Sequence, residues 1–74
     1  MNEQTKEKAL SAQELAQRLS LSKRSIHRLN SSGKIPAPIR IGGSIRWLES
    51  TISNWLQAGA PDRKTWETIE GQQR

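Results

Sequence analysis

The sequence predicts a mainly α fold with a small β-hairpin, in the order helix, helix, strand, strand, helix and a short C-terminal helix. Two observations support this fold class. Two helix-start signals follow each other closely, and farther along the chain the apolar spacing changes from helical to alternating around Gly42-Gly43. The 74 residues have room for one domain with a thin core. Three tryptophans and periodic leucines and isoleucines indicate that this domain is folded.

The first helix is predicted over Ala12 to Leu19. Ser11 and Glu14 have the spacing of a capping box, with Ser11 as the N-cap. Leu10 and Leu15 occupy the two positions of a hydrophobic staple. Together these signals set the start of the first helix and turn its apolar side toward the core.

The second helix is predicted over Lys23 to Ser31. Ser22 is its N-cap, Leu21 and Ile26 form a second staple, and Gly33 is suited to a left-handed C-cap. Because the turn between the two helices is short, we expect them to cross steeply, as in a helix-turn-helix.

The outward face of the second helix is basic. At 100° per residue Ile26 and Leu29 define its buried side, and Lys23 lies at the flank of the first turn. The opposite side carries Arg24, His27, Arg28 and Ser31.

After an extended connector over 34–38, which contains two prolines, a β-hairpin is predicted. A two-residue turn at Gly42-Gly43 would mix apolar and charged residues on each face. We favour a three-residue loop over 42–44, because it collects the apolar residues on one face. It also places Arg40 directly opposite Arg46, and such a like-charge pair suggests a phosphate site. The apolar residues of the hairpin are Ile39, Ile41, Ile45 and Trp47.

A third helix is predicted over Thr51 to Ala58, with Ser50 as its N-cap. A final short helix begins at Asp62 and docks through Trp66 and Ile69. We expect residues 1–8 to form a disordered arm, residues 9–69 the domain, and residues 70–74 a polar tail.

Charge is sorted along the chain. The stretch from Leu15 to Leu48 holds seven bases and no acid, which gives +7, whereas the five bases and seven acids elsewhere give −2. A folded stretch of one sign attracts polyanions, and nucleic acid is the commonest of these. The seven bases are Arg18, Lys23, Arg24, Arg28, Lys34, Arg40 and Arg46. Of these, Arg18 is as well explained by a surface position at the end of the first helix.

Several classes of protein are excluded by composition. With no cysteine and a single histidine, the chain cannot form a zinc finger, a disulfide scaffold or a cysteine nucleophile. We expect no catalytic residue, no metal, no cofactor and no small-molecule substrate. No apolar run is long enough for a signal peptide or a membrane span, so a cytoplasmic protein is expected.

The predicted order of elements describes a winged helix-turn-helix. From Leu10 to Leu56 the residues "LSAQELAQRLSLSKRSIHRLNSSGKIPAPIRIGGSIRWLESTISNWL", with the tail "AGAPDRKTWE", resemble the small MerR-like DNA-binding proteins of the AlpA-type phage regulator and excisionase family. The resemblance implies that the helix over 22–31 enters the major groove of DNA. It also implies that the hairpin over 39–47 is a wing on the backbone or minor groove. Ser20 departs from the pattern, which usually has glycine at the turn, and a left-handed Ser20 costs about 1 kcal/mol.

Two roles are expected for the site residues. Exposed hydroxyls and cations suit phosphate contacts, and arginine can pair bidentately with guanine, so we expect Arg24 to be the best base reader. The phosphate group is Ser22, Ser25, Lys34, Arg40 and Arg46. The base-reading group is Lys23, Arg24, His27 and Arg28.

Two hypotheses from different classes follow. The first is sequence-specific binding of double-stranded DNA, by a phage or mobile-element transcription regulator or by an excisionase that directs recombination. The second is a protein-interaction module that inhibits a regulator or recruits an integrase. Because no helix is long enough for a dimer zipper, we expect a monomer in solution that can assemble on repeated DNA sites.

Overall fold

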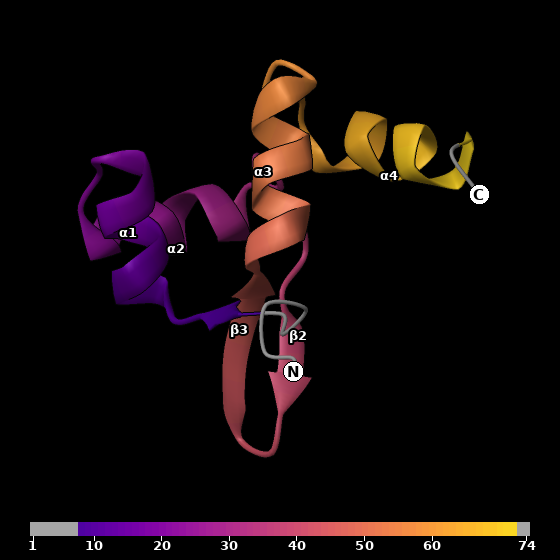
Figure 1. The fold of residues 1–74 in the computed structure, drawn as a ribbon. Coiled ribbons are helices and arrows are strands. Elements are labelled where there is room, and N and C mark those ends of the chain that lie inside the picture. Colours follow the sequence, from indigo (N-terminus) through magenta and orange to yellow (C-terminus); the bar gives the residue numbers. More distant parts are fainter. Residues whose placement is uncertain (1–7, 73–74) are drawn as a thin grey trace.

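The computed structural model describes residues 8–72, so the predicted arm over 1–8 lies outside it except for Lys8, as do the last two residues. Four helices surround one end of a three-stranded antiparallel sheet, and the hairpin projects away from them (Figure 1). The elements are β1 (Ala9–Leu10), α1 (Ala12–Leu19), α2 (Lys23–Ser31), β2 (Ile39–Ile41), β3 (Ser44–Leu48), α3 (Glu49–Gln57) and α4 (Arg63–Gln72).

The start of α1 confirms the capping box. The backbone N–H of Glu14 donates to Ser11 Oγ at 3.1 Å, and the backbone N–H of Ser11 donates to Glu14 Oε1 at 2.9 Å. The bond from the Ser11 backbone lowers the pKa of the Glu14 carboxyl. Leu10 and Leu15 are both buried, as the staple requires.

The turn into α2 also follows the prediction. Ser20 ends α1 in the left-handed region, with φ 59° and ψ 40°. Ser22 caps α2 by accepting from the backbone N–H of Ser25 at 3.0 Å, and Ile26 is fully buried. After α2, Gly33 is left-handed with φ 71°, and the N–H of Lys34 closes the helix end on the carbonyl of Leu29 at 2.9 Å.

The predicted hairpin register is wrong. Ile39 pairs with Arg46, Arg40 with Ile45 and Ile41 with Ser44, so the turn contains only Gly42 and Gly43. A positive φ at Gly42, with none at Gly43, is the pattern of a type II′ turn, whose twist suits a two-residue hairpin.

The apolar residues of the hairpin do not share one face, because its outer part does not lie on the core. Directly paired residues share a face, so Ile39 and Ile41 lie on the face opposite to Ile45 and Trp47. They are 41% and 53% exposed, whereas Trp47 is buried. The alternation of apolar residues in the hairpin therefore does not correspond to a single buried face.

A short strand that was not predicted completes the sheet. β1 pairs with β3 through Ala9 with Leu48 and Leu10 with Trp47, which makes β3 the central strand. Beyond it, the carbonyl of Lys8 accepts the backbone N–H of Glu49 at 2.8 Å. Two residues are too few to produce a periodic signal.

Both C-terminal helices differ from the prediction at their ends. α3 begins at Glu49, before the predicted N-cap Ser50, and its N-cap Leu48 makes no side-chain capping bond. Because Leu48 ends β3, the chain passes directly from strand to helix. α4 begins at Arg63, one residue after the predicted start Asp62, whose Oδ1 accepts the N–H of Thr65 at 2.9 Å. It continues to Gln72, so the start of the predicted polar tail is helical.

The core joins all four helices to β3. The three tryptophans are buried, as expected; Trp47 Nε1 donates to the carbonyl of Pro36 at 2.8 Å, and Trp55 Nε1 to that of Pro61 at 2.7 Å. The buried apolar residues are Leu10, Ala12, Leu15, Ala16, Ile26, Ile35, Trp47, Ile52, Trp55 and Trp66. In the described part of the chain no helix is long and apolar enough to cross a membrane.

Hydrogen bonds of Arg63 link α4 to the end of α2, a role that was not predicted from the sequence. Its guanidinium donates to the carbonyl of Ile35 at 3.0 Å, and to the carbonyl and Oδ1 of Asn30 at 3.3 and 2.7 Å. Its backbone N–H donates to the carbonyl of Gly33 at 2.9 Å. This arginine therefore belongs to the scaffold.

Candidate nucleic-acid interface

The outward face of α2 is exposed and carries no acid. Lys23, Arg24, His27 and Arg28 are all exposed, while Ile26 on the other side of the helix is in the core. In Figure 1, α1 crosses in front of α2. A helix that presents only basic and neutral groups to solvent is suited to a polyanion.

Two of the predicted phosphate ligands are already engaged in the helix cap. Ser22 Oγ accepts the backbone N–H of Ser25 and donates to Ser25 Oγ, both at 3.0 Å. Ser25 is half-buried. These hydroxyls therefore act first on helix structure, because a contact with a phosphate must compete with the cap.

The two arginines of the wing, the hairpin of β2 and β3, do not form the expected opposed pair. Because Arg40 pairs with Ile45 and Arg46 with Ile39, the two arginines lie on opposite faces of the hairpin. Arg40 is exposed. Arg46 is half-buried, and its Nη1 donates to the carbonyl of Ile45 at 2.7 Å. The phosphate site predicted between them is therefore wrong.

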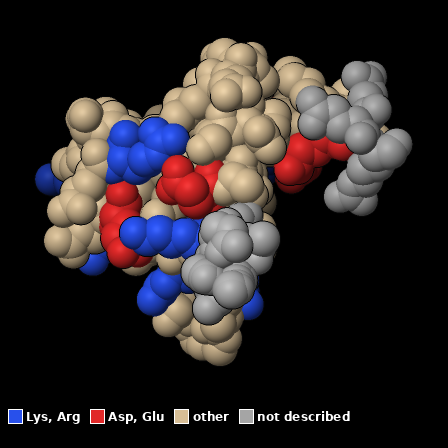
Figure 2. Space-filling view, in the orientation of Figure 1, with Lys and Arg blue, Asp and Glu red and all other residues tan. Residues whose placement is uncertain are grey.

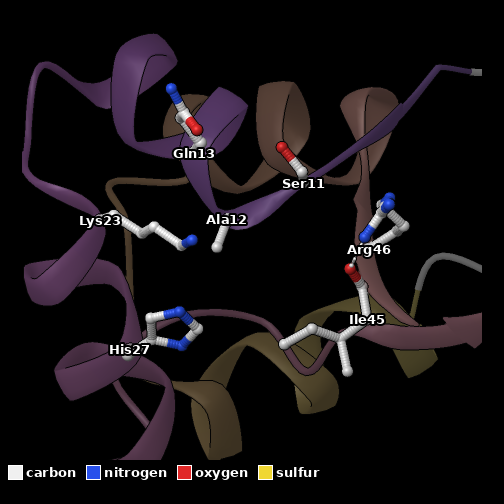
Figure 3. Close-up of a pocket in the computed structure, with 7 residues that line it drawn as sticks. All are labelled: Ser11, Ala12, Gln13, Lys23, His27, Ile45 and Arg46. Carbon is white, nitrogen blue, oxygen red and sulfur yellow. Dashed lines mark hydrogen bonds between the residues drawn. The ribbon is translucent and has the colours of Figure 1, made fainter. Parts of the chain in front are cut away.

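Arg46 instead lines an open pocket of about 270 Å³ that separates β3 from α2. Figure 3 shows Lys23 and His27 of α2 on one side of this pocket and Ile45 and Arg46 of β3 on the other. The start of α1 closes it from above in that view. The complete lining is Ser11, Ala12, Gln13, Lys23, His27, Ile45 and Arg46.

Arg18 belongs to the scaffold and not to the basic surface. Its Nε donates to Glu49 Oε2 at 3.0 Å, and its Nη2 donates to Ser53 Oγ at 3.2 Å, which links α1 to α3. On the face of the molecule in Figure 2, basic and acidic side chains lie next to each other. On this face, therefore, the acid-free stretch of sequence does not form one continuous basic surface.

Lys34 is exposed just after α2 and does not line the pocket. The hydrogen bond from the Thr65 backbone lowers the pKa of the Asp62 carboxyl, and the charge of Lys34 lowers it further. Lys34 therefore lies close enough to Asp62 for this acid to offset part of its charge.

Sequence reasoning missed the part that α1 and Ile45 play in the site. Ser11 was interpreted only as an N-cap, and Gln13 carries no signal of its own. Both line the pocket, together with Ile45. Only a predicted contact between the start of α1 and the hairpin would have identified them.

The fold and this surface define a helix-turn-helix domain followed by a β-hairpin in the position of a wing. The family described as helix-turn-helix domain matches residues 9–60, and the chain belongs to that family. Membership indicates DNA as the partner. Comparison with curated proteins and with solved structures gave no match.

Proposed function

We propose that this protein binds double-stranded DNA in a sequence-specific manner, with α2 in the major groove and the wing on the backbone or minor groove. The observation that carries the proposal is the exposed, acid-free face of α2 in a helix-turn-helix domain. In such domains the second helix is the one that enters the major groove.

Arg24 and Arg28 are the proposed base readers. They are four residues apart on one side of α2, both are exposed, and neither lines the pocket beside the wing. Their guanidinium groups can each pair bidentately with O6 and N7 of a guanine, which contributes about 1 to 3 kcal/mol of discrimination.

Selection of bound duplexes from a random pool, followed by titration of the selected site, tests the proposal. We expect Arg24→Ala or Arg28→Ala to lose about 1 to 3 kcal/mol of affinity for that site and to relax the preference at one base pair. Lys64→Ala, at an exposed position on α4, is the matched control and should leave the affinity unchanged. Unchanged affinity in both arginine variants would contradict the proposed interface.

The biological role that we propose is regulation of transcription in a phage or mobile element, or direction of excision by a recombinase. Its support is the resemblance of residues 10–56 to AlpA-type regulators and excisionases. Genomic footprinting distinguishes the two roles. Bound sites at promoters indicate a regulator, whereas sites at the ends of an integrated element indicate an excisionase.

The exposed isoleucines of the wing favour a second candidate function, a protein-interaction module that inhibits a regulator or recruits an integrase. Ile39 and Ile41 are 41% and 53% exposed on one face of the hairpin. If this face binds a protein, Ile41→Ser should abolish capture of a purified integrase and leave DNA affinity unchanged. A loss of DNA affinity alone would instead place Ile41 at the DNA.

A further inference from the structure

The exposed face of α2 consists of two parallel pairs of basic residues. Lys23 and His27 are one helical turn apart, and Arg24 and Arg28 form the next row. Lys23 and His27 line the pocket beside the wing, whereas Arg24 and Arg28 do not. The two rows therefore face different surroundings, although they are adjacent in sequence.

Three basic side chains from two elements line the pocket. Lys23 and His27 lie across from Arg46, whose guanidinium is oriented by its bond to the Ile45 carbonyl at 2.7 Å (Figure 3). Lysine and arginine donate hydrogen bonds as cations, and imidazole retains an N–H donor even when neutral. None of the described residues that line the pocket is acidic.

The Glu14 carboxylate, which the charge of Arg46 influences, is already engaged. Glu14 on α1 accepts the backbone N–H of Ser11 at 2.9 Å, and this bond is the main cause of its lowered pKa. The charges of Lys8 and Arg46 contribute to the same shift, so Glu14 offsets part of the charge of Arg46. Lys23 and His27 on the opposite wall have no carboxylate partner among the described residues.

The lining also has an apolar part, Ala12 and Ile45. A phosphodiester of a nucleic acid combines an anionic group with the apolar face of its sugar, and both parts find complementary groups here. If α2 lies in the major groove and the wing reaches the adjacent groove, the strand that separates the grooves passes between them. The pocket lies at that point, between α2 and β3.

We propose that this pocket binds one phosphodiester of the DNA backbone, with Lys23, His27 and Arg46 contacting its oxygens and Ile45 its deoxyribose. This inference rests on the proposed function and assigns Lys23 and His27 to the backbone, leaving base reading to Arg24 and Arg28. A contact that joins the recognition helix to the wing sets their relative position on the duplex.

The test uses His27 as a reporter, because it is the only histidine in the chain. Inorganic phosphate is added to the full-length protein in place of chloride at constant ionic strength, and the ring signals of His27 are followed by NMR. We expect a saturable shift that Arg46→Ala abolishes and Arg40→Ala preserves, because Arg40 is not among the residues that line the pocket. Equal effects of the two variants, or no saturable shift, would contradict phosphate binding in this pocket.

A second measurement uses a short DNA duplex of arbitrary sequence. Arg46→Ala should reduce the magnitude of the slope of log K against log salt by about 0.9, the contribution of one phosphate. The double variant Arg46→Ala, His27→Gln should lose less binding free energy than the sum of the two single variants, because both residues contact the same phosphate. Full additivity would overturn the shared contact. Unchanged tryptophan fluorescence and melting temperature establish that the variants are folded.

The outcomes separate this inference from the proposed function. DNA binding without a phosphate effect at His27 would overturn the pocket and leave the proposed function in place. Phosphate binding in the pocket without affinity for any duplex would overturn both the DNA assignment and the proposed function.

Discussion

At the scale of single residues, local chemistry decides where α1 and α2 begin and end. Ser20 ends α1 in the left-handed conformation, with φ 59°. Residues with a Cβ atom adopt this conformation at a cost of about 1 kcal/mol. The tight turn therefore retains a small strain that a single substitution can remove.

Ser20→Gly should raise the free energy of unfolding by up to about 1 kcal/mol, because glycine adopts the left-handed conformation without this cost. Urea denaturation followed by tryptophan fluorescence measures the change. Ser32→Gly is the matched control, because Ser32 ends α2 with an ordinary φ of −93°. A gain in stability in the control variant as well would show that the conformation of Ser20 is not the cause.

At the scale of secondary-structure elements, a two-residue turn places the two arginines of the hairpin on opposite faces. With Gly42 and Gly43 alone in the turn, Arg46 pairs with Ile39 and Arg40 pairs with Ile45, and of the two arginines only Arg46 lines the pocket. A longer loop would have changed every pairing, because neighbouring residues of a strand point to opposite faces.

Gly42→Ala should destabilise the protein by about 1 kcal/mol, because φ at Gly42 is 62° although no atom lies within 4 Å of an added Cβ. Gly43→Ala is the control, with the same open surroundings and no positive φ, and should change the stability by less than about 0.5 kcal/mol. Thermal unfolding measures both. Equal losses in the two variants would contradict the turn conformation.

The attachment of α4 is a second element-scale feature. Arg63→Ala should lower the stability by about 1.5 to 3 kcal/mol, because it removes charged hydrogen bonds to Asn30 and Ile35. Denaturation compared with Lys64→Ala, an exposed neighbour on the same helix, isolates this effect. Similar losses in both variants would mean that a change in helix propensity, and not the loss of the Arg63 hydrogen bonds, lowers the stability.

At the scale of the whole molecule, folding divides the basic residues between scaffold and surface. Arg18 pairs with Glu49 and Ser53, and Arg63 fastens α4, whereas the bases of α2 remain exposed. Long-range attraction to DNA therefore depends on how these charges are distributed in space and not on the net charge of +5.

The affinity for DNA should fall steeply with salt. If about five phosphates are neutralised, log K should change with log salt with a slope of about −4 to −5. Fluorescence anisotropy at several salt concentrations measures it. Arg46→Ala should reduce the magnitude of the slope, whereas Arg18→Ala should not, because Arg18 is paired with Glu49. A slope near zero would contradict electrostatic binding.

Most of the fold could be predicted because its signals are local. The caps of α1 and α2, the staple of Leu10 and Leu15 and the exposed side of α2 depend on residues within one or two turns of each other. The features that could not be predicted from the sequence depend on residues far away in the chain. β1 exists only because β3 pairs with it, and the start of α3 depends on the end of β3 and the carbonyl of Lys8.

The sequence alone determined two helices, their tight turn, the basic side of the second helix and the presence of a hairpin. Hydrogen bonds within a few residues and the helical repeat are sufficient for these features. Only the tertiary structure decided the register of the hairpin, the pairing of Arg18 and the position of Arg46 beside Lys23 and His27. Those features arise between elements that are far apart in the chain, where packing determines which side chains meet.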